Sequence, residues 1–285
     1  MDKAEKEALE KYFLQFLNFE KQYPLLPGFR EAGPVATLLG LERDELSGLR
    51  DRFRSNAEEA ASELLDEEEI EERLQKLPFR SGEKIVAIGD SMTDDLQGWC
   101  SIFSELLNKG TDLSDIEVIN SGVSYNTTSE ALRRLHRDVL SLNPDWVMVS
   151  LGTFDAIRLN IAPDRTLLPL SETWENLNTI QSAIEQVTEQ PVIWISPPPV
   201  IGGLLDEMEL FDFQIDEKDL FSIREVIAGK RGYHVDPAGT RMGNPAEAWY
   251  YLSDGVNPSL SGHTNTVRAL VKALSTDLET NNGSD

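Results

Sequence analysis

Apolar residues follow two different patterns along the 285-residue chain. From about residue 82 onward, short apolar runs alternate with longer amphipathic stretches. The short runs predict strands at 84–89, 116–120, 146–151, 191–195 and 233–235. The amphipathic stretches predict helices at 95–108, 128–142, 171–188, 218–228 and 260–277. Strands that alternate with helices in this way indicate a doubly wound parallel sheet with helices on both faces.

The first 80 residues show only helical periodicity. We predict a helix over 3–23, a less regular helical piece over 34–53 and a third helix over 57–77, which Pro78 closes. The chain is therefore divided into a helical extension (1–80), an α/β domain (81–278) and a flexible tail (279–285). The extension contains no chemical motif. We expect it either to pack on the α/β domain or to mediate formation of a homo-oligomer.

Composition narrows the classes of function. Fifty acidic side chains against 26 basic ones give a formal charge of −24, which argues against nucleic acid as a partner. No apolar run is long enough for a membrane span, and the N-terminus lacks an apolar export region, so we expect a cytoplasmic protein. The single cysteine, Cys100, excludes an internal disulfide, and we expect it to be a buried core residue. No residues have metal-ligand spacing, and we expect no cofactor.

The first predicted strand ends in Gly89-Asp90-Ser91. This places a serine hydroxyl at the C-terminal edge of a parallel sheet, where open α/β sheets bind ligands. A glycine before the turn permits backbone geometry that other residues resist. We interpret Asp94 and Asp95 as charges at the start of the following helix.

Three further polar turns are expected at the same edge of the sheet. Two follow predicted strands and the last precedes the final helix; they span residues 120–128, 152–155 and 253–263. Together with Gly89-Asp90-Ser91, these turns make four blocks in order along the chain.

The four ordered blocks resemble those of the SGNH/GDSL hydrolases, over roughly residues 82–275. The resemblance implies a three-layer α/β/α domain with a flavodoxin-like parallel sheet and hydrolysis of acyl or acetyl esters. It implies that Ser91 is the nucleophile and that the backbone N–H groups of Ser91 and Gly122 form an oxyanion hole. The family's third oxyanion donor is an asparagine, and Phe154 occupies its position. Phe154 either forms a wall of an acyl pocket or fills the vacated space.

The last block departs from the family pattern more strongly. The family has Asp-x-x-His-Pro, whereas this chain has Asp254-Gly255-Val256-Asn257-Pro258. An asparagine cannot act as a general base near neutral pH, so Asp254 lacks the histidine that it would orient. Of the three histidines, His263 is the candidate substitute base. We expect His136 to be partly exposed and structural, and His234 to be packed.

Two functions remain open from the sequence. In the first, the protein is an ester hydrolase that acts on a small-molecule, lipid or carbohydrate ester with weak activity, using Ser91 with His263 or Asp254 as a nonstandard base. In the second, it is a non-catalytic small-molecule-binding or assembly protein that retains the site as a pocket.

Overall fold

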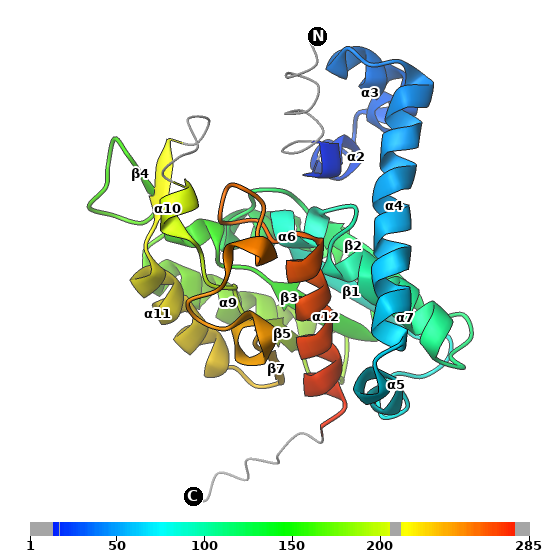
Figure 1. The fold of residues 1–285 in the computed structure, drawn as a ribbon. Coiled ribbons are helices and arrows are strands. Elements are labelled where there is room, and N and C mark those ends of the chain that lie inside the picture. Colours follow the sequence, from blue (N-terminus) through cyan, green and yellow to red (C-terminus); the bar gives the residue numbers. More distant parts are fainter. Residues whose placement is uncertain (1–13, 17, 206–211, 277–285) are drawn as a thin grey trace, which may run out of the picture.

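A five-stranded parallel sheet forms the centre of the molecule (Figure 1). The computed structural model describes residues 14–16, 18–205 and 212–276. The strand order is β2-β1-β3-β5-β7, as the doubly wound, flavodoxin-like prediction requires. The strands are β1 (Lys84–Gly89), β2 (Glu117–Gly122), β3 (Trp146–Ser150), β5 (Ile193–Ile195) and β7 (Tyr233–Val235). The predicted three-layer α/β/α class is confirmed.

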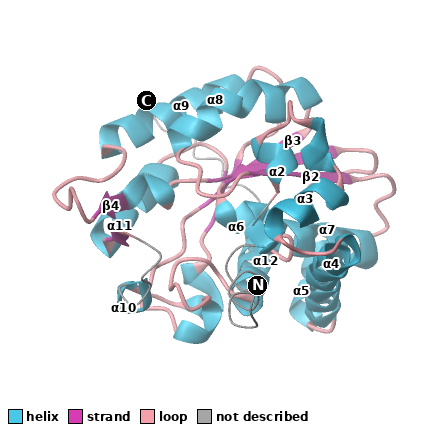
Figure 2. Cartoon of the chain, turned by 90° about the horizontal axis from the view of Figure 1, so that it is seen from above, coloured by secondary structure: helices cyan, strands magenta, loops and turns pink. Residues whose placement is uncertain are grey.

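Alternate residues of β1 enter two separate hydrophobic clusters, because successive side chains of a strand point to opposite faces. Ile85 and Ala87 pack in the cluster that contains α7 and α12. Val86 and Ile88 pack in the cluster that contains α8, α9 and α11. Both faces of the sheet are therefore covered by helices (Figure 2). These helices are α7 (Trp99–Gly110), α8 (Thr128–Asp138), α9 (Leu170–Ile184), α11 (Glu217–Ala228) and α12 (Leu260–Leu274).

The helix expected at 95–108 begins only at Trp99, because the preceding residues form a separate turn, α6 (Ser91–Asp94). A small antiparallel pair, β4 (Ile157–Leu159) and β6 (Phe213–Ile215), was not predicted. Three-residue strands are too short to show a period of two in the sequence. The short helix α10 (Gly202–Leu205) lies between β5 and β6 in the chain.

The N-terminal helices differ from the prediction. Most of the helix expected at 3–23 lies outside the described residues, and its described part is a 3₁₀ turn, Leu14–Phe16, followed by α2 (Phe19–Gln22). Another 3₁₀ turn, Pro27–Arg30, leads to α3 (Ala32–Leu39). The next helix, α4 (Arg43–Leu65), is continuous, so the division near residue 55 was wrong. The helix expected at 57–77 breaks before α5 (Glu68–Leu74).

The break before α5 coincides with a cluster of charges. Glu67 accepts hydrogen bonds from Arg241 and Arg268, which lie far away in the sequence, at 2.7 and 2.5 Å. These contacts hold the pKa of Glu67 below its ordinary value, although burial opposes them. Tertiary contacts of this kind override local helical periodicity. Residues of α4 and α5 share one hydrophobic cluster with the sheet.

Among the helices formed by described residues, none combines the length and apolar character that crossing a bilayer requires. The lone cysteine, Cys100, is buried in α7, as expected, and burial raises the pKa of its thiol to about 12.

Candidate active site

Ser91 is the first residue of α6 and directly follows the turn at the end of β1. The carboxylate of Asp90 caps this turn by accepting a hydrogen bond from the backbone N–H of Met92 at 3.0 Å. The Ser91 side chain is fully buried, and its Oγ accepts a hydrogen bond from the backbone N–H of Tyr125 at 2.9 Å. The hydroxyl is therefore oriented by the loop that follows β2.

Gly89 is required for close packing rather than for unusual backbone conformation. A Cβ at this position would lie 2.0 Å from the Thr93 hydroxyl and 2.8 Å from the carbonyl oxygen of Ser150. Gly122 is equally confined, because a Cβ there would lie 2.5 Å from the backbone nitrogen of Asp94. The two glycines let the ends of β1 and β2 approach the serine turn.

The backbone N–H of Gly122 already has an acceptor in this structure. It donates to the side-chain Oδ1 of Asn120 at 2.9 Å, in the manner of an Asx turn. The same oxygen accepts a hydrogen bond from Lys21 Nζ at 2.9 Å. For Gly122 to stabilise an oxyanion, this bond with Asn120 has to open.

Phe154 begins a 3₁₀ turn after β3 and is 1% exposed. Its ring packs edge-on against that of Tyr125, with centroids 5.2 Å apart. Tyr125 adopts a left-handed backbone conformation, with φ of 62°, which is rare for a bulky residue. Burial, together with the charge of Asp254, raises the pKa of the Tyr125 phenol to about 12.

Asp254 and Asn257 form a closely bonded pair. One carboxylate oxygen of Asp254 accepts hydrogen bonds from the backbone N–H groups of Val256 and Asn257, each at 2.9 Å. The other accepts a hydrogen bond from the side-chain amide of Asn257 at 2.8 Å. Asn257 is 2% exposed, and its Oδ1 has no hydrogen-bond partner within the described part of the chain.

His263 lies in the first turn of α12 and is 1% exposed. Its Nε2 lies 3.1 Å from a carboxylate oxygen of Asp95, whereas its Nδ1 has no partner among the described residues. No hydrogen bond joins His263 to Ser91 in the ranges that the structure describes. His136 is exposed; His234 is also exposed, with Nε2 bonded to the carbonyl oxygen of Lys230, so its expected packed position was wrong.

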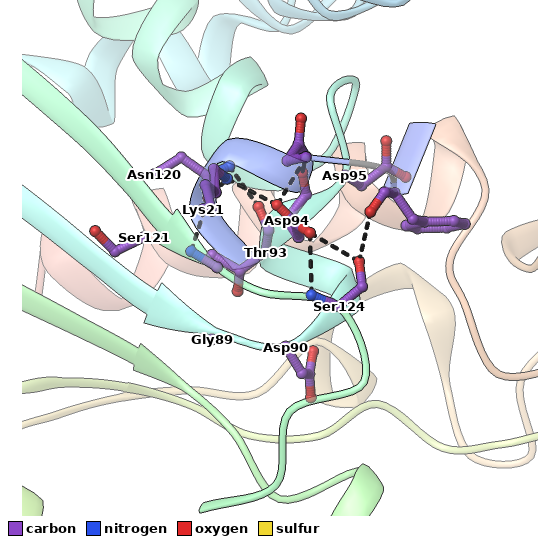
Figure 3. Close-up of polar contacts among 12 residues, drawn as sticks. Lys21, Gly89, Asp90, Thr93, Asp94, Asp95, Asn120, Ser121 and Ser124 are labelled. Carbon is purple, nitrogen blue, oxygen red and sulfur yellow. Dashed lines mark hydrogen bonds and ion pairs between the residues drawn. The ribbon is translucent and has the colours of Figure 1, made fainter. Parts of the chain in front are cut away.

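Asp94 ends the short turn α6, and the helix expected at 95–108 begins only at Trp99, so the interpretation of Asp94 and Asp95 as charges at the start of that helix was wrong. Gly98 caps α7 instead, and both aspartates are buried. Asp95 bonds His263 and the backbone N–H of Gln97. Asp94 receives hydrogen bonds from the N-terminal segment and from Ser124 (Figure 3).

Asp155, in the turn after β3, bonds the first turns of α8 and α9. Its carboxylate accepts hydrogen bonds from the backbone N–H and hydroxyl of Thr128, at 2.8 and 2.6 Å, and from the Thr173 hydroxyl at 2.8 Å. Burial nevertheless raises the pKa of Asp155. Within the described residues, no group of His, Cys, Asp or Glu side chains could hold a metal ion.

Burial raises the pKa of Asp90 from 3.8 to about 7, with a smaller contribution from the charge of Asp155. Because the folded state binds this proton more tightly, the associated stability is lost as pH rises through about 7. Asp90→Asn keeps an acceptor for the Met92 N–H but cannot ionise. We therefore expect its free energy of unfolding, relative to that of the parent, to rise by roughly 1–3 kcal/mol as the pH increases from 5 to 8. Urea unfolding of both chains at each pH measures this difference; a constant difference would contradict the assignment.

A serine at the C-terminal edge of β1 in a doubly wound sheet, together with a hydrogen-bonded aspartate in the last loop, is the arrangement of an α/β protein of the serine hydrolase type. The GDSL-like Lipase/Acylhydrolase family matches residues 87–264, and the chain belongs to this family.

Related proteins agree with this assignment. The chain is 23% identical over 223 residues to an acetylxylan esterase of Geobacillus stearothermophilus, a match that covers 68% of this chain and 94% of the relative. It is 33% identical over 85 residues to an arylesterase of Vibrio mimicus, covering 28% of this chain and 41% of that protein.

Solved structures share the fold. The crystal structure of the Geobacillus stearothermophilus acetylxylan esterase has a TM-score of 0.52 and 23% identity, covering 70% of this chain and 96% of that one. A lipase/acylhydrolase from Enterococcus faecalis also has a TM-score of 0.52 and 23% identity, covering 68% and 95% respectively.

Several residues around Ser91 were not singled out from the sequence. Asn120 and Tyr125 lie in the block 120–128 but were given no role, and the contacts of Lys21 span more than 70 positions in the chain. The only sequence signal at Tyr125 is a bulky residue within a turn-forming stretch of small and polar residues.

Proposed function

We propose that the protein hydrolyses acyl or acetyl esters of a small molecule, lipid or carbohydrate at Ser91, at a rate limited by the absence of a histidine base. Ser91 would form the acyl-enzyme, and the backbone N–H groups of Ser91 and Gly122 would bind the oxyanion. The observation that carries the proposal is the Asp254–Asn257 pair. Its amide occupies the place next to the carboxylate that the family gives to histidine.

A base other than the family histidine would have to accept the serine proton. Asp254 is engaged with two backbone N–H groups and with the amide of Asn257. His263 is engaged with Asp95. We propose that either group acts only weakly on Ser91, since a general base must reach the proton directly or through one water.

A second candidate is a non-catalytic protein that binds a small molecule at this site. It is favoured by the bond between Gly122 and Asn120, which occupies an oxyanion donor. It is also favoured by the buried Phe154 ring, which lies where the family has a polar donor.

Hydrolysis of p-nitrophenyl acetate and p-nitrophenyl butyrate distinguishes the two candidates. We expect the parent chain to be slow but faster than Ser91→Ala by about 10-fold or more, because a positioned nucleophile retains part of its advantage without a base. The measurement is initial rate at equal concentrations of folded protein. Equal rates in both chains would reject Ser91-dependent hydrolysis of these esters and favour the binding protein.

A further inference from the structure

We propose that Asp94 is a positioning residue that fixes the loop carrying Gly122 and Tyr125 against Ser91, and that Asn18 and Lys21 complete this device. The inference rests on the proposed role of Ser91. It gives the helical extension a function at the site, which its sequence did not suggest.

Asp94 ties the loop after β2 to the serine turn. One of its carboxylate oxygens accepts hydrogen bonds from the backbone N–H and the hydroxyl of Ser124, at 3.0 and 2.8 Å. The next residue, Tyr125, donates its backbone N–H to Ser91 Oγ. Asp94 and Ser91 are the two ends of α6, so these contacts close a ring that orients the hydroxyl.

The second carboxylate oxygen of Asp94 faces the N-terminal segment (Figure 3). It accepts hydrogen bonds from Asn18 Nδ2 at 2.7 Å and from Lys21 Nζ at 2.8 Å. Asn18 also donates to the backbone carbonyl of Asp94 at 2.9 Å. The Asp94 side chain is 3% exposed, and a paired cation offsets part of the cost of burying its charge. Lys21 supplies that cation.

Lys21 also reaches the other side of the loop. Its Nζ donates to Asn120 Oδ1, the oxygen that accepts the N–H of Gly122. A further contact joins Ser124 Oγ to the carbonyl oxygen of Phe16 at 3.0 Å. The N-terminal segment therefore contacts both the end of β2, at Asn120, and the loop that follows it, at Ser124.

These contacts come from outside the region that the family shares. The family match begins at residue 87, whereas Phe16, Asn18 and Lys21 precede it by more than 60 positions. Residues outside the family match therefore contribute contacts to the loop that orients Ser91. Removal of the Lys21 charge should deprive the buried Asp94 of its ion pair and loosen the loop.

The test uses the full chain with Lys21→Met and Asp94→Asn, and with Lys76→Met as the matched control. Lys76 is exposed on the surface of the extension. Hydrogen exchange at the amides of Ser124 and Tyr125 reports the order of the loop. The rate at which an alkyl fluorophosphonate labels Ser91, measured by mass spectrometry per folded protein, reports the orientation of the hydroxyl.

We expect amide exchange at Ser124 and Tyr125 to be about 10-fold faster or more in both variants, because each loses a hydrogen bond to a charged group. Ser91 labelling should slow by a similar factor, and Lys76→Met should match the parent in both readouts. Lys21→Arg, which keeps the charge, should retain most of the protection.

Unchanged loop exchange in Lys21→Met and Asp94→Asn would overturn the inference. A uniform rise in exchange that includes β3 would also overturn it, because it would show general destabilisation rather than positioning. If the parent chain is not labelled at Ser91, the proposed function fails, and the exchange measurement still decides whether Asp94 and Lys21 order the loop.

Discussion

Replacing Phe154 by asparagine and Asn257 by histidine in one chain is expected to raise kcat/KM toward p-nitrophenyl acetate by at least about 100-fold. The first change supplies a side-chain donor near the oxyanion. The second supplies a base that can take the serine proton. These steps differ, so the two changes should each contribute.

The structure already contains the support for a histidine at 257. Asp254 Oδ2 accepts a hydrogen bond from the Asn257 amide at 2.8 Å, and the imidazole Nδ1–H would replace that donor. The carboxylate would then fix the tautomer of the ring and leave its Nε2 free to accept a proton.

Each single variant and the double variant in a Ser91→Ala background are the controls. Phe154→Asn places an amide in a core position and should lower stability by roughly 1–3 kcal/mol, so rates are compared per folded protein. If the double variant gains no Ser91-dependent activity, then the absence of the family's asparagine and histidine does not limit the rate of hydrolysis. The pocket itself would then be closed to esters.

Arg134→Met is expected to lower the free energy of unfolding by about 3 kcal/mol or more. The guanidinium is buried in α8 and donates to the carbonyl oxygens of Gly89 and Ser121, at 2.9 and 2.6 Å. It also donates to Asn126 Oδ1 and to Asp138. Burial lowers the pKa of Arg134, and the contact with Asp138 opposes this shift.

The expected loss of stability follows from the hydrogen bonds that the Arg134→Met substitution removes. Methionine keeps the apolar volume but removes the hydrogen bonds to the carbonyl oxygens of Gly89 and Ser121, although Gly89 keeps the backbone N–H of Val123 as a donor at 3.1 Å. Arg133→Met is the matched control, because Arg133 is the neighbouring exposed residue of the same helix. Its effect should stay within about 0.5 kcal/mol in urea unfolding. Similar losses in both variants would show that Arg134 does not brace the strand ends.

The central sheet could be predicted from the sequence because β1, β3 and β5 are apolar on both faces and the strands are separated by helices. Strands of three residues, such as β4 and β6, show no period, and their pairing depends on the chain around them. The helices of the N-terminal extension were harder to predict than these short strands. Its helix boundaries depend on distant partners, as at Glu67, which bonds Arg241 and Arg268.

The site residues that could be predicted from the sequence are those in the four polar turns. Ser91, Asp254 and Asn257 follow this rule, although their catalytic roles remain predictions. Asp94 shows the opposite case, since its position in the sequence is typical of a helix start. Burial and the approach of Asn18 and Lys21 determine its actual contacts, and neither can be read from spacing alone.

The central claim is that the absence of a base at position 257 limits Ser91. The pH dependence of p-nitrophenyl acetate hydrolysis by Asn257→His, with Ser91→Ala/Asn257→His as reference, tests it most directly. We predict that the Ser91-dependent rate rises with pH through an apparent pKa of about 6.5, as a histidine base requires. Identical pH profiles for the two chains would contradict the claim.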